Sequence, residues 1–301
     1  MMQGKIIKGI AGFYTVYGEN GQQYECKARG SFRKDGVKPY VGDNVKIRVL
    51  DEQELLGNIE EILPRKNALV RPAVANVDQA MIVFAMASPL PNLNLLDRFL
   101  VMMEWQGVET VVCFSKQDIV EEEQEKQLRE IYQSCGKQVF CFSNTEGTGI
   151  DEIRACLRGC TTVLAGPSGV GKSSFLNRIY PEALSEVGGI SEKIGRGKHT
   201  TRHSELFYIG DDSFLFDTPG FSSLNLPEDM PKEELRSCMR EFVPFESECR
   251  FLGCSHIHEP GCLVKQKQEE GVIAKSRYQN YVQMYEELAE AEKRNYGRNR
   301  K

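Results

Sequence analysis

The sequence has no hydrophobic run long enough to cross a lipid bilayer. Its longest apolar stretch, residues 80–87, is far shorter than the roughly 20 residues that a membrane-spanning helix needs. No apolar segment of the secretory type follows the first eight residues. A strong excess of one charge is also missing, because the net charge is only −5 over 301 residues. We therefore expect a cytoplasmic protein of two or three domains with no membrane partner, which meets nucleic acid only through local patches.

A phosphate-binding loop is indicated by the segment Gly166-Pro167-Ser168-Gly169-Val170-Gly171-Lys172-Ser173-Ser174. The apolar residues 161–165 before it predict a buried strand, and residues 174–179 after it predict a helix. In that context the backbone N–H groups of the loop surround an anion, and the helix N-terminus lies behind it. Lys172 would reach the outer phosphates and the Ser173 hydroxyl would bind Mg²⁺. A chance glycine-rich turn is the alternative, and the flanking strand and helix disfavour it.

The first part of the chain, residues 1–68, predicts a small β-domain. Short segments of strand character are separated by Gly, Asn and Asp turns, and such a set suits a closed barrel of the OB type. The expected strands cover residues 6–10, 13–17, 23–28, 45–49 and 58–63.

The connection between the third and fourth of these strands is a candidate RNA-binding surface. Residues 27–40 carry five basic residues and one acid, and their aromatic rings could stack on nucleobases. A solvated loop whose charges only maintain solubility is an equally good interpretation of this segment alone. The candidate RNA-binding residues are Lys27, Arg29, Phe32, Arg33, Lys34 and Lys38.

The middle of the chain, residues 69–225, alternates between strand and helix patterns. This alternation predicts an α/β domain with a mostly parallel sheet that is covered on both faces. Phosphate ligands then bind at the carboxyl ends of the strands. The expected strands cover residues 79–87, 108–114 and 138–142, and the expected helices cover residues 94–106, 120–134 and 150–158.

Polar residues follow two of these strands at the positions where a base could be recognised. Ser115, Lys116 and Asp118 follow the strand 108–114, and Asp118 could accept hydrogen bonds from the ring N–H and exocyclic amine of guanine. The stem of Lys116 would lie along the base. Ser143 and Asn144 follow the strand 138–142 and would touch the base edge with backbone amides.

A further strand, residues 213–216, leads into the sequence Asp-Thr-Pro-Gly. Asp217 would hold Mg²⁺ through water, and the Gly220 N–H would meet the γ-phosphate. The preceding residues 188–203, rich in glycine and bases, indicate a mobile switch in which Thr200 or Thr201 offers a hydroxyl to Mg²⁺. Each of these motifs is weak alone, but together they fit one nucleotide pocket.

The chain resembles the translation-factor class of GTPases, except that the base-reading motifs precede the phosphate loop. This order is what a circular permutation produces. The combination of an OB-like barrel, a permuted P-loop GTPase and a C-terminal cysteine cluster is similar to the ribosome small-subunit-dependent GTPase family of bacteria. The resemblance implies a late assembly factor that binds the small ribosomal subunit and its rRNA, hydrolyses GTP to GDP when the subunit stimulates it, and then dissociates.

Two positions depart from the pattern of ordinary GTPases. Ser115 stands where the Asn-Lys-x-Asp motif has the asparagine that braces the phosphate loop, so we expect reduced nucleotide affinity, while Asp118 preserves guanine preference. Phe221 stands where Ras-like enzymes carry a water-orienting glutamine, so unaided hydrolysis should be slow. His199 is the candidate catalytic residue, since it lies beside Thr200 and the resemblance points to the same place.

Ten cysteines in such a chain favour reduced thiols and a metal cluster over a disulfide framework. The last part, residues 226–301, predicts a mostly helical subdomain, with helices over residues 232–241 and 275–294. Three cysteines and one histidine within fourteen residues match a closed Cys₃His zinc site, which leaves no position for water and is therefore structural. The resemblance selects His256 over His258, and the ligands are Cys249, Cys254, His256 and Cys262.

The sequence alone leaves other functions open. An RNA-binding adaptor whose nucleotide does not turn over meaningfully is favoured by Phe221 and Ser115. A zinc hydrolase is disfavoured by the closed ligand set, and an ATPase would be recognised by competition between ATP and GTP. We expect a monomer that binds GTP or GDP with Mg²⁺ and one structural Zn²⁺ for each chain.

Overall fold

The structure is a computed structural model that describes residues 1–29, 32, 37–69, 73–180, 205–217, 224–227 and 229–298. The chain forms two compact units, each of which combines segments that are distant in sequence. One unit contains Met1–Ala80, Asp151–Ala165 and Lys172–Pro219, and the other contains Met81–Ile150, Gly166–Gly171 and Gly220–Lys301. Among the described residues, no helix is both long enough and apolar enough to cross a membrane.

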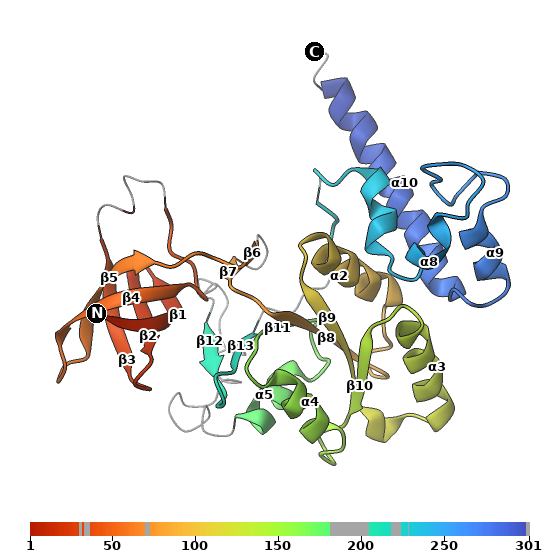
Figure 1. Ribbon diagram of the computed structural model, residues 1–301. Helices are drawn as coiled ribbons and strands as arrows, with labels where there is room; N and C mark the ends of the chain where they lie inside the picture. Colours follow the sequence, from red (N-terminus) through yellow and green to blue (C-terminus); the bar gives the residue numbers. More distant parts are fainter. Residues whose placement is uncertain are drawn as a thin grey trace. The chain divides into compact units, whose positions relative to one another are not determined.

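The N-terminal strands close into a five-stranded barrel in the order β1-β2-β3-β5-β4 (Figure 1). The pairing of β3 with β5 is parallel, and the other pairs are antiparallel. Alternate apolar residues such as Ile6, Val16 and Ile47 fill the interior, as expected for strands with a two-residue period. The predicted OB-like barrel is therefore confirmed. Its strands are β1 (Met2–Ile10), β2 (Phe13–Gly18), β3 (Gln23–Ala28), β4 (Asn44–Asp51) and β5 (Leu56–Ile62).

The middle of the chain forms a six-stranded sheet in the order β10-β9-β8-β11-β13-β12. Neighbours β9 and β10 are parallel, as are β11 and β13, while the edge strand β12 is antiparallel to β13. Every residue of β8 and β11 is buried, which explains why both strands are apolar after Gln79, Thr161 and Thr162 at their starts. The strands are β8 (Gln79–Ala85), β9 (Glu109–Ser115), β10 (Gln138–Phe142), β11 (Thr161–Ala165), β12 (Leu206–Tyr208) and β13 (Phe214–Asp217), and a small ladder joins β6 (Ala68–Leu69) to β7 (Val74–Ala75).

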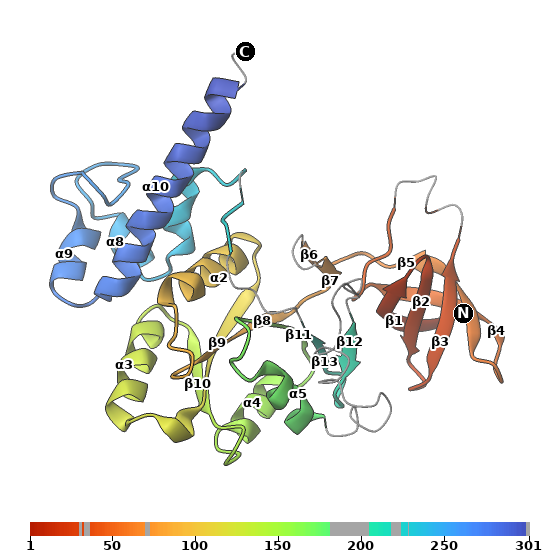
Figure 2. The same cartoon turned by 180° about the vertical axis from the view of Figure 1, so that it is seen from behind.

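Helices connect these strands at the positions that the sequence pattern predicts. The first is capped by Asn92, whose side chain accepts a hydrogen bond from the Leu95 N–H. Figures 1 and 2 both show α4 beside α5. The helical elements are α2 (Leu93–Trp105), the 3₁₀ turn η1 (Gln117–Ile119), α3 (Glu122–Gln133), α4 (Ile150–Leu157) and α5 (Lys172–Ile179).

Within the first unit, the barrel contacts the strands β11 and β12 of the sheet. The Lys5 ammonium donates to the Thr161 hydroxyl at 3.0 Å, and the rings of Tyr17 and Tyr208 stack with centroids 4.5 Å apart. Lys8 forms an ion pair with Glu205, the first described residue after the segment 181–204. The barrel is thus held next to β12, which follows the predicted switch.

The C-terminal part is helical, and a buried ionic cluster fixes it to α2. The Arg277 guanidinium donates to Asp97 at 2.6 Å and to Glu241 at 2.8 Å, and Tyr132 donates to Asp97 at 3.1 Å. The predicted helix over residues 232–241 is a shorter 3₁₀ segment that begins after Pro231. The elements are η2 (Lys232–Cys238), α8 (Val243–Glu246), α9 (Leu263–Glu269) and α10 (Lys275–Arg298).

The described elements confirm the predicted fold class, namely a closed barrel, a central α/β domain and a helical region with a Cys₃His cluster. The boundaries at residues 68 and 225 stay a prediction.

Candidate functional site

The phosphate-binding segment joins β11 to α5 in a conformation that requires glycine. Gly166 has a φ of 144°, and a Cβ added there would lie 2.1 Å from the carbonyl oxygen of Val83 in β8. Gly169 and Gly171 also have positive φ values, of 79° and 94°. Lys172 is the first residue of α5, so the backbone N–H groups of the loop and of the first helical turn gather at one place. This arrangement can bind a phosphate.

Two side chains from other strand ends hold the loop. The Ser115 hydroxyl, at the end of β9, donates to the Val170 carbonyl oxygen at 2.6 Å. The Asn144 amide, just beyond β10, donates to the Gly171 carbonyl oxygen at 3.0 Å. The loss of the usual asparagine at position 115 therefore does not leave the loop without support.

The residues predicted to read the base lie close in sequence to Ser115 and Asn144, the two side chains that hold the loop. Asp118 is exposed on the 3₁₀ turn that follows β9, so its carboxylate is accessible to a ligand. Lys116 adopts a left-handed conformation with a φ of 63° and donates from its ammonium group to the Ser88 carbonyl. The buried Ser143 hydroxyl accepts hydrogen bonds from the N–H groups of Thr145 and Glu146, which shapes the turn after β10.

The predicted magnesium-binding side of the site lies at the ends of β11 and β13. These strands are parallel, and Asp217 pairs in register with Leu164, two residues before the phosphate loop. Burial raises the pKa of Asp217 to about 6, although the Lys172 ammonium acts in the opposite direction. Burial also lowers the pKa of Lys172. The Asp217 Oδ1 atom is buried and has no hydrogen-bond partner among the described residues.

This donor set suits a hard divalent cation. A buried carboxylate oxygen that lacks a partner and the half-buried Ser173 hydroxyl are oxygen ligands of the kind that Mg²⁺ prefers. A bound cation would also lower the pKa of Asp217, because it stabilises the charged carboxylate. The predicted residues His199, Thr200, Thr201 and Gly220 lie outside the described residues, and so does Phe221.

The predicted RNA-binding residues lie on and after β3 of the barrel. Lys27 is exposed, with its ammonium 5.1 Å from the centre of the exposed Phe13 ring. Arg29 is exposed and forms an ion pair with Glu60 at 2.8 Å, and Lys38 is exposed as well. Phe32 is half-buried and packs against the barrel core, so its ring is only partly available to stack on a base. Arg33 and Lys34 lie outside the described residues.

The cysteine cluster brings four ligand atoms together in the C-terminal region. One ligand atom from each of Cys249, Cys254, His256 and Cys262 lies within 4.8 Å of the others. The His256 Nδ1 atom is 3.3 Å from the Cys262 sulfur and 3.7 Å from the Cys249 sulfur, and these two sulfurs are 4.0 Å apart. A tetrahedral zinc site has ligand atoms separated by roughly 3.4–3.8 Å, so these four residues can hold a metal ion of that size. His258 is exposed and outside the cluster.

Residues that sequence reasoning missed fix this cluster in place. The Glu246 carboxylate lies 3.5 Å from the His256 Nε2 atom, so its charge is next to the ring, although neither of these two atoms has a hydrogen-bond partner among the described residues. Tyr278 and Tyr281 of α10 donate their hydroxyls to the carbonyl oxygens of His256 and Ser255. No sequence signal separates Glu246 from the other acids of the chain.

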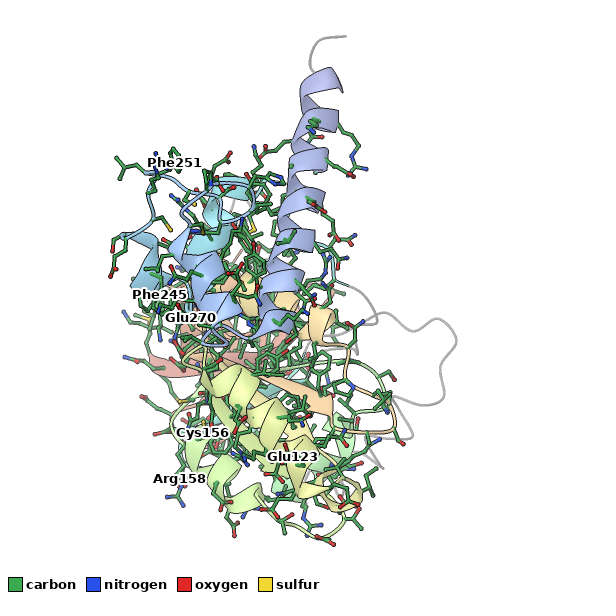
Figure 3. The ribbon with its side chains drawn as sticks, turned by 90° about the vertical axis from the view of Figure 1, so that its right-hand side faces the viewer. Glu123, Cys156, Arg158, Phe245, Phe251 and Glu270 are labelled. Carbon is green, nitrogen blue, oxygen red and sulfur yellow. The ribbon has the colours of Figure 1, made fainter. Side chains whose placement is uncertain are left out.

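The loop that carries the ligands has little apolar core of its own. Leu252 is fully exposed, and Figure 3 shows Phe251 at the periphery of the C-terminal region. The Glu259 carboxylate closes the loop by accepting hydrogen bonds from the N–H groups of Ser255 and Ile257. Burial alone would raise the pKa of Glu259, but these hydrogen bonds lower it to about 2. The backbone of this loop is therefore held in part by hydrogen bonds to the Glu259 carboxylate.

Fold and site together define a circularly permuted P-loop GTPase with an added barrel. The family model described as the RsgA N-terminal domain matches residues 3–57, and the model described as RsgA GTPase matches residues 62–227. The chain belongs to the RsgA GTPase family and is a GTP-hydrolysing enzyme.

Relatives and solved structures agree over nearly the whole chain. A protein of Agathobacter rectalis named small ribosomal subunit biogenesis GTPase RsgA is 54% identical, with 97% of this chain and 100% of the relative covered. A protein of the same name from Alkaliphilus metalliredigens is 48% identical and covers 96% and 98%. The crystal structure of YjeQ from Thermotoga maritima is 37% identical with a TM-score of 0.79, covering 96% of this chain and 98% of that one. The structure of YloQ, described as a circularly permuted GTPase, is 36% identical with a TM-score of 0.78 and covers 96% of each chain.

Proposed function

We propose that this protein is a GTPase that acts in the late assembly of the small ribosomal subunit. GTP favours docking on the subunit, the subunit stimulates hydrolysis, and GDP favours release. The names of the full-length relatives support the role in biogenesis. The observation that carries the proposal is the 2.6 Å hydrogen bond from Ser115 to Val170, because it joins the base-reading segment to the phosphate loop despite their permuted order.

In this proposal the nucleotide is bound by segments from four strand ends. The loop N–H groups and Lys172 bind the phosphates, and Asp118 accepts from the guanine base. Ser173 and Asp217 hold Mg²⁺ with Thr200 or Thr201, and the ion neutralises charge on the phosphates. The proposed GTP-binding residues are Ser115, Lys116, Asp118, Ser143, Asn144, Gly166, Pro167, Ser168, Gly169, Val170, Gly171, Lys172, Ser173, Ser174 and Gly220.

His199 is the proposed catalytic residue, because Phe221 has no group that could orient water. The proposal predicts that His199→Ala binds GTP with the affinity of the natural chain and loses turnover stimulated by the subunit. Unchanged stimulated turnover in this variant would remove His199 from the mechanism.

The proposed metal in the cysteine cluster is a structural Zn²⁺, one for each chain, since four protein ligands leave no open position. We also propose that the barrel surface with Lys27, Arg29, Phe32, Arg33, Lys34 and Lys38 contacts rRNA. The protein would act as a monomer in the cytoplasm, where bacterial subunits are assembled.

The decisive experiment is release of inorganic phosphate from GTP with and without purified small subunits. A strong increase in turnover with subunits supports the proposal. An RNA-binding adaptor, the second candidate, would cosediment with subunits and show no stimulation. ATP should not compete with GTP, because adenine lacks the donor pair that Asp118 accepts.

A further inference from the structure

The phosphate loop is held by two side chains at two consecutive carbonyl groups. Ser115 is completely buried and donates its hydroxyl to the Val170 oxygen at 2.6 Å. Asn144 donates its amide to the next oxygen along, that of Gly171, at 3.0 Å. Both bonds have the length of good hydrogen bonds.

A serine alone cannot supply both of these bonds. A hydroxyl has one proton to donate, and the Ser115 proton is committed to Val170, because its other neighbour, the Phe84 oxygen, is further away at 3.4 Å. The Gly171 carbonyl therefore needs a second donor, and the one present is an amide that belongs to a different strand end.

These two carbonyls control the groups that face the phosphate. Because the peptide unit is planar and trans, the N–H of each residue points opposite to the carbonyl of the residue before it. Holding the Val170 and Gly171 oxygens on the side of Ser115 and Asn144 thus turns the N–H groups of Gly171 and Lys172 the other way. Those N–H groups lie in the part of the loop that cradles phosphates.

The backbone at Gly171 fits the same arrangement. Its φ is 94°, and a Cβ added there would lie 2.8 Å from the Asn144 Nδ2 atom. A side chain at position 171 would therefore displace the Asn144 amide from the position in which it forms this hydrogen bond.

We propose that Asn144 is a positioning residue which supplies the loop-bracing amide that GTPases of this type usually carry at position 115. Ser115 and Asn144, at the ends of two neighbouring strands, share the brace. Asn144 acts through the loop and not by a contact of its side chain with the nucleotide. This inference rests on the proposed function of the loop as the nucleotide site.

The proposal is tested by moving the amide to position 115. GDP affinity and GDP dissociation rate are measured by calorimetry and stopped-flow for Asn144→Ala, for Ser115→Asn, and for the double variant. Asn144→Ala leaves a loop carbonyl without its donor, so we expect GDP to bind roughly 10-fold more weakly and to dissociate faster. The double variant should recover to within about three-fold of the natural chain, since the amide is restored from position 115.

Asn20→Ala is the matched control, because the same amide is removed from the barrel, where it bonds Gln22 and Tyr24. It should bind GDP normally. The melting temperatures without nucleotide separate a general loss of stability from a loss of loop position. If Asn144→Ala binds GDP like the natural chain, or if Ser115→Asn does not restore binding in a folded double variant, the inference is wrong. If the natural chain itself binds no GDP, the proposed function fails and the inference fails with it.

Discussion

Replacing Gly166 by alanine should strongly weaken nucleotide binding, because the loop leaves no room for a methyl group. The added Cβ would lie 2.1 Å from the Val83 carbonyl oxygen, whereas real Cβ atoms essentially never approach closer than 3.0 Å. The loop or the strand must therefore open by about 0.9 Å at the least. Val83 is completely buried in β8, and its backbone oxygen cannot rotate away as a side chain would.

The expected cost has two parts. The φ of 144° is unfavourable for alanine by about 1–3 kcal/mol, and the overlap with Val83 adds about 1–3 kcal/mol, as insertions into packed interiors do. The free energy of unfolding should fall by about 2–6 kcal/mol. A displacement of the loop near 1 Å misplaces the groups that bind phosphate, so GDP affinity should fall on the order of 100-fold.

Calorimetry with GDP and thermal unfolding without it measure the two effects. Gly159→Ala is the control, because Gly159 also has a positive φ, of 68°, but a Cβ added there meets no atom within 4 Å. The control should lose about 1–2 kcal/mol of stability from its backbone conformation and bind GDP normally. If Gly166→Ala matched this control in both measurements, the close approach of the loop to β8 would not be a constraint.

Three further predictions concern the metal cluster and the barrel. Cys254→Ser should lower the zinc content, measured by elemental analysis, from one per chain to near zero. Cys238 is a buried cysteine outside the cluster, so Cys238→Ser should keep the zinc. Equal zinc contents in the two variants would contradict the assignment. Glu246→Gln should weaken zinc binding about 10- to 100-fold in a chelator competition, because the ring of its histidine partner loses the charge next to it, and an unchanged affinity would exclude that role. Replacing both Lys27 and Arg29 by alanine should lower the slope of log affinity for small subunits against log salt concentration by about 2, and an unchanged slope would mean that they do not touch rRNA.

Most of the fold could be predicted from the sequence, because periodic apolar patterns and glycine-rich turns are local signals. The barrel strands and the strands β8, β9, β10 and β11 all coincide with patterns of this kind. The edge strand β12 could not be predicted, since its three residues form a strand only by pairing with β13. Residues 232–238 form a 3₁₀ segment and not a full helix, a difference that depends on packing and on Pro231.

The sequence predicted which residues form the site, but it did not predict the contacts that their side chains make. Asn144 was expected to use backbone amides at the base, whereas its side chain bonds the phosphate loop. Ser115 was expected to weaken the loop, yet its burial at the end of β9 brings the short hydroxyl within reach of Val170. Glu246 contacts His256 only after the chain has folded. Such contacts join residues that are distant in sequence, and no local pattern encodes them.

The central claim is that segments in permuted order form one pocket for a guanine nucleotide, and Asp118→Asn tests it most directly. Aspartate accepts from the ring N–H and the exocyclic amine of guanine, whereas asparagine can donate to the carbonyl that replaces this amine in xanthine. We predict that the variant binds GDP about 100-fold more weakly or worse, and that it binds xanthosine diphosphate instead. A variant that bound GDP as tightly as the natural chain would show that Asp118 does not read the base, and would contradict the account.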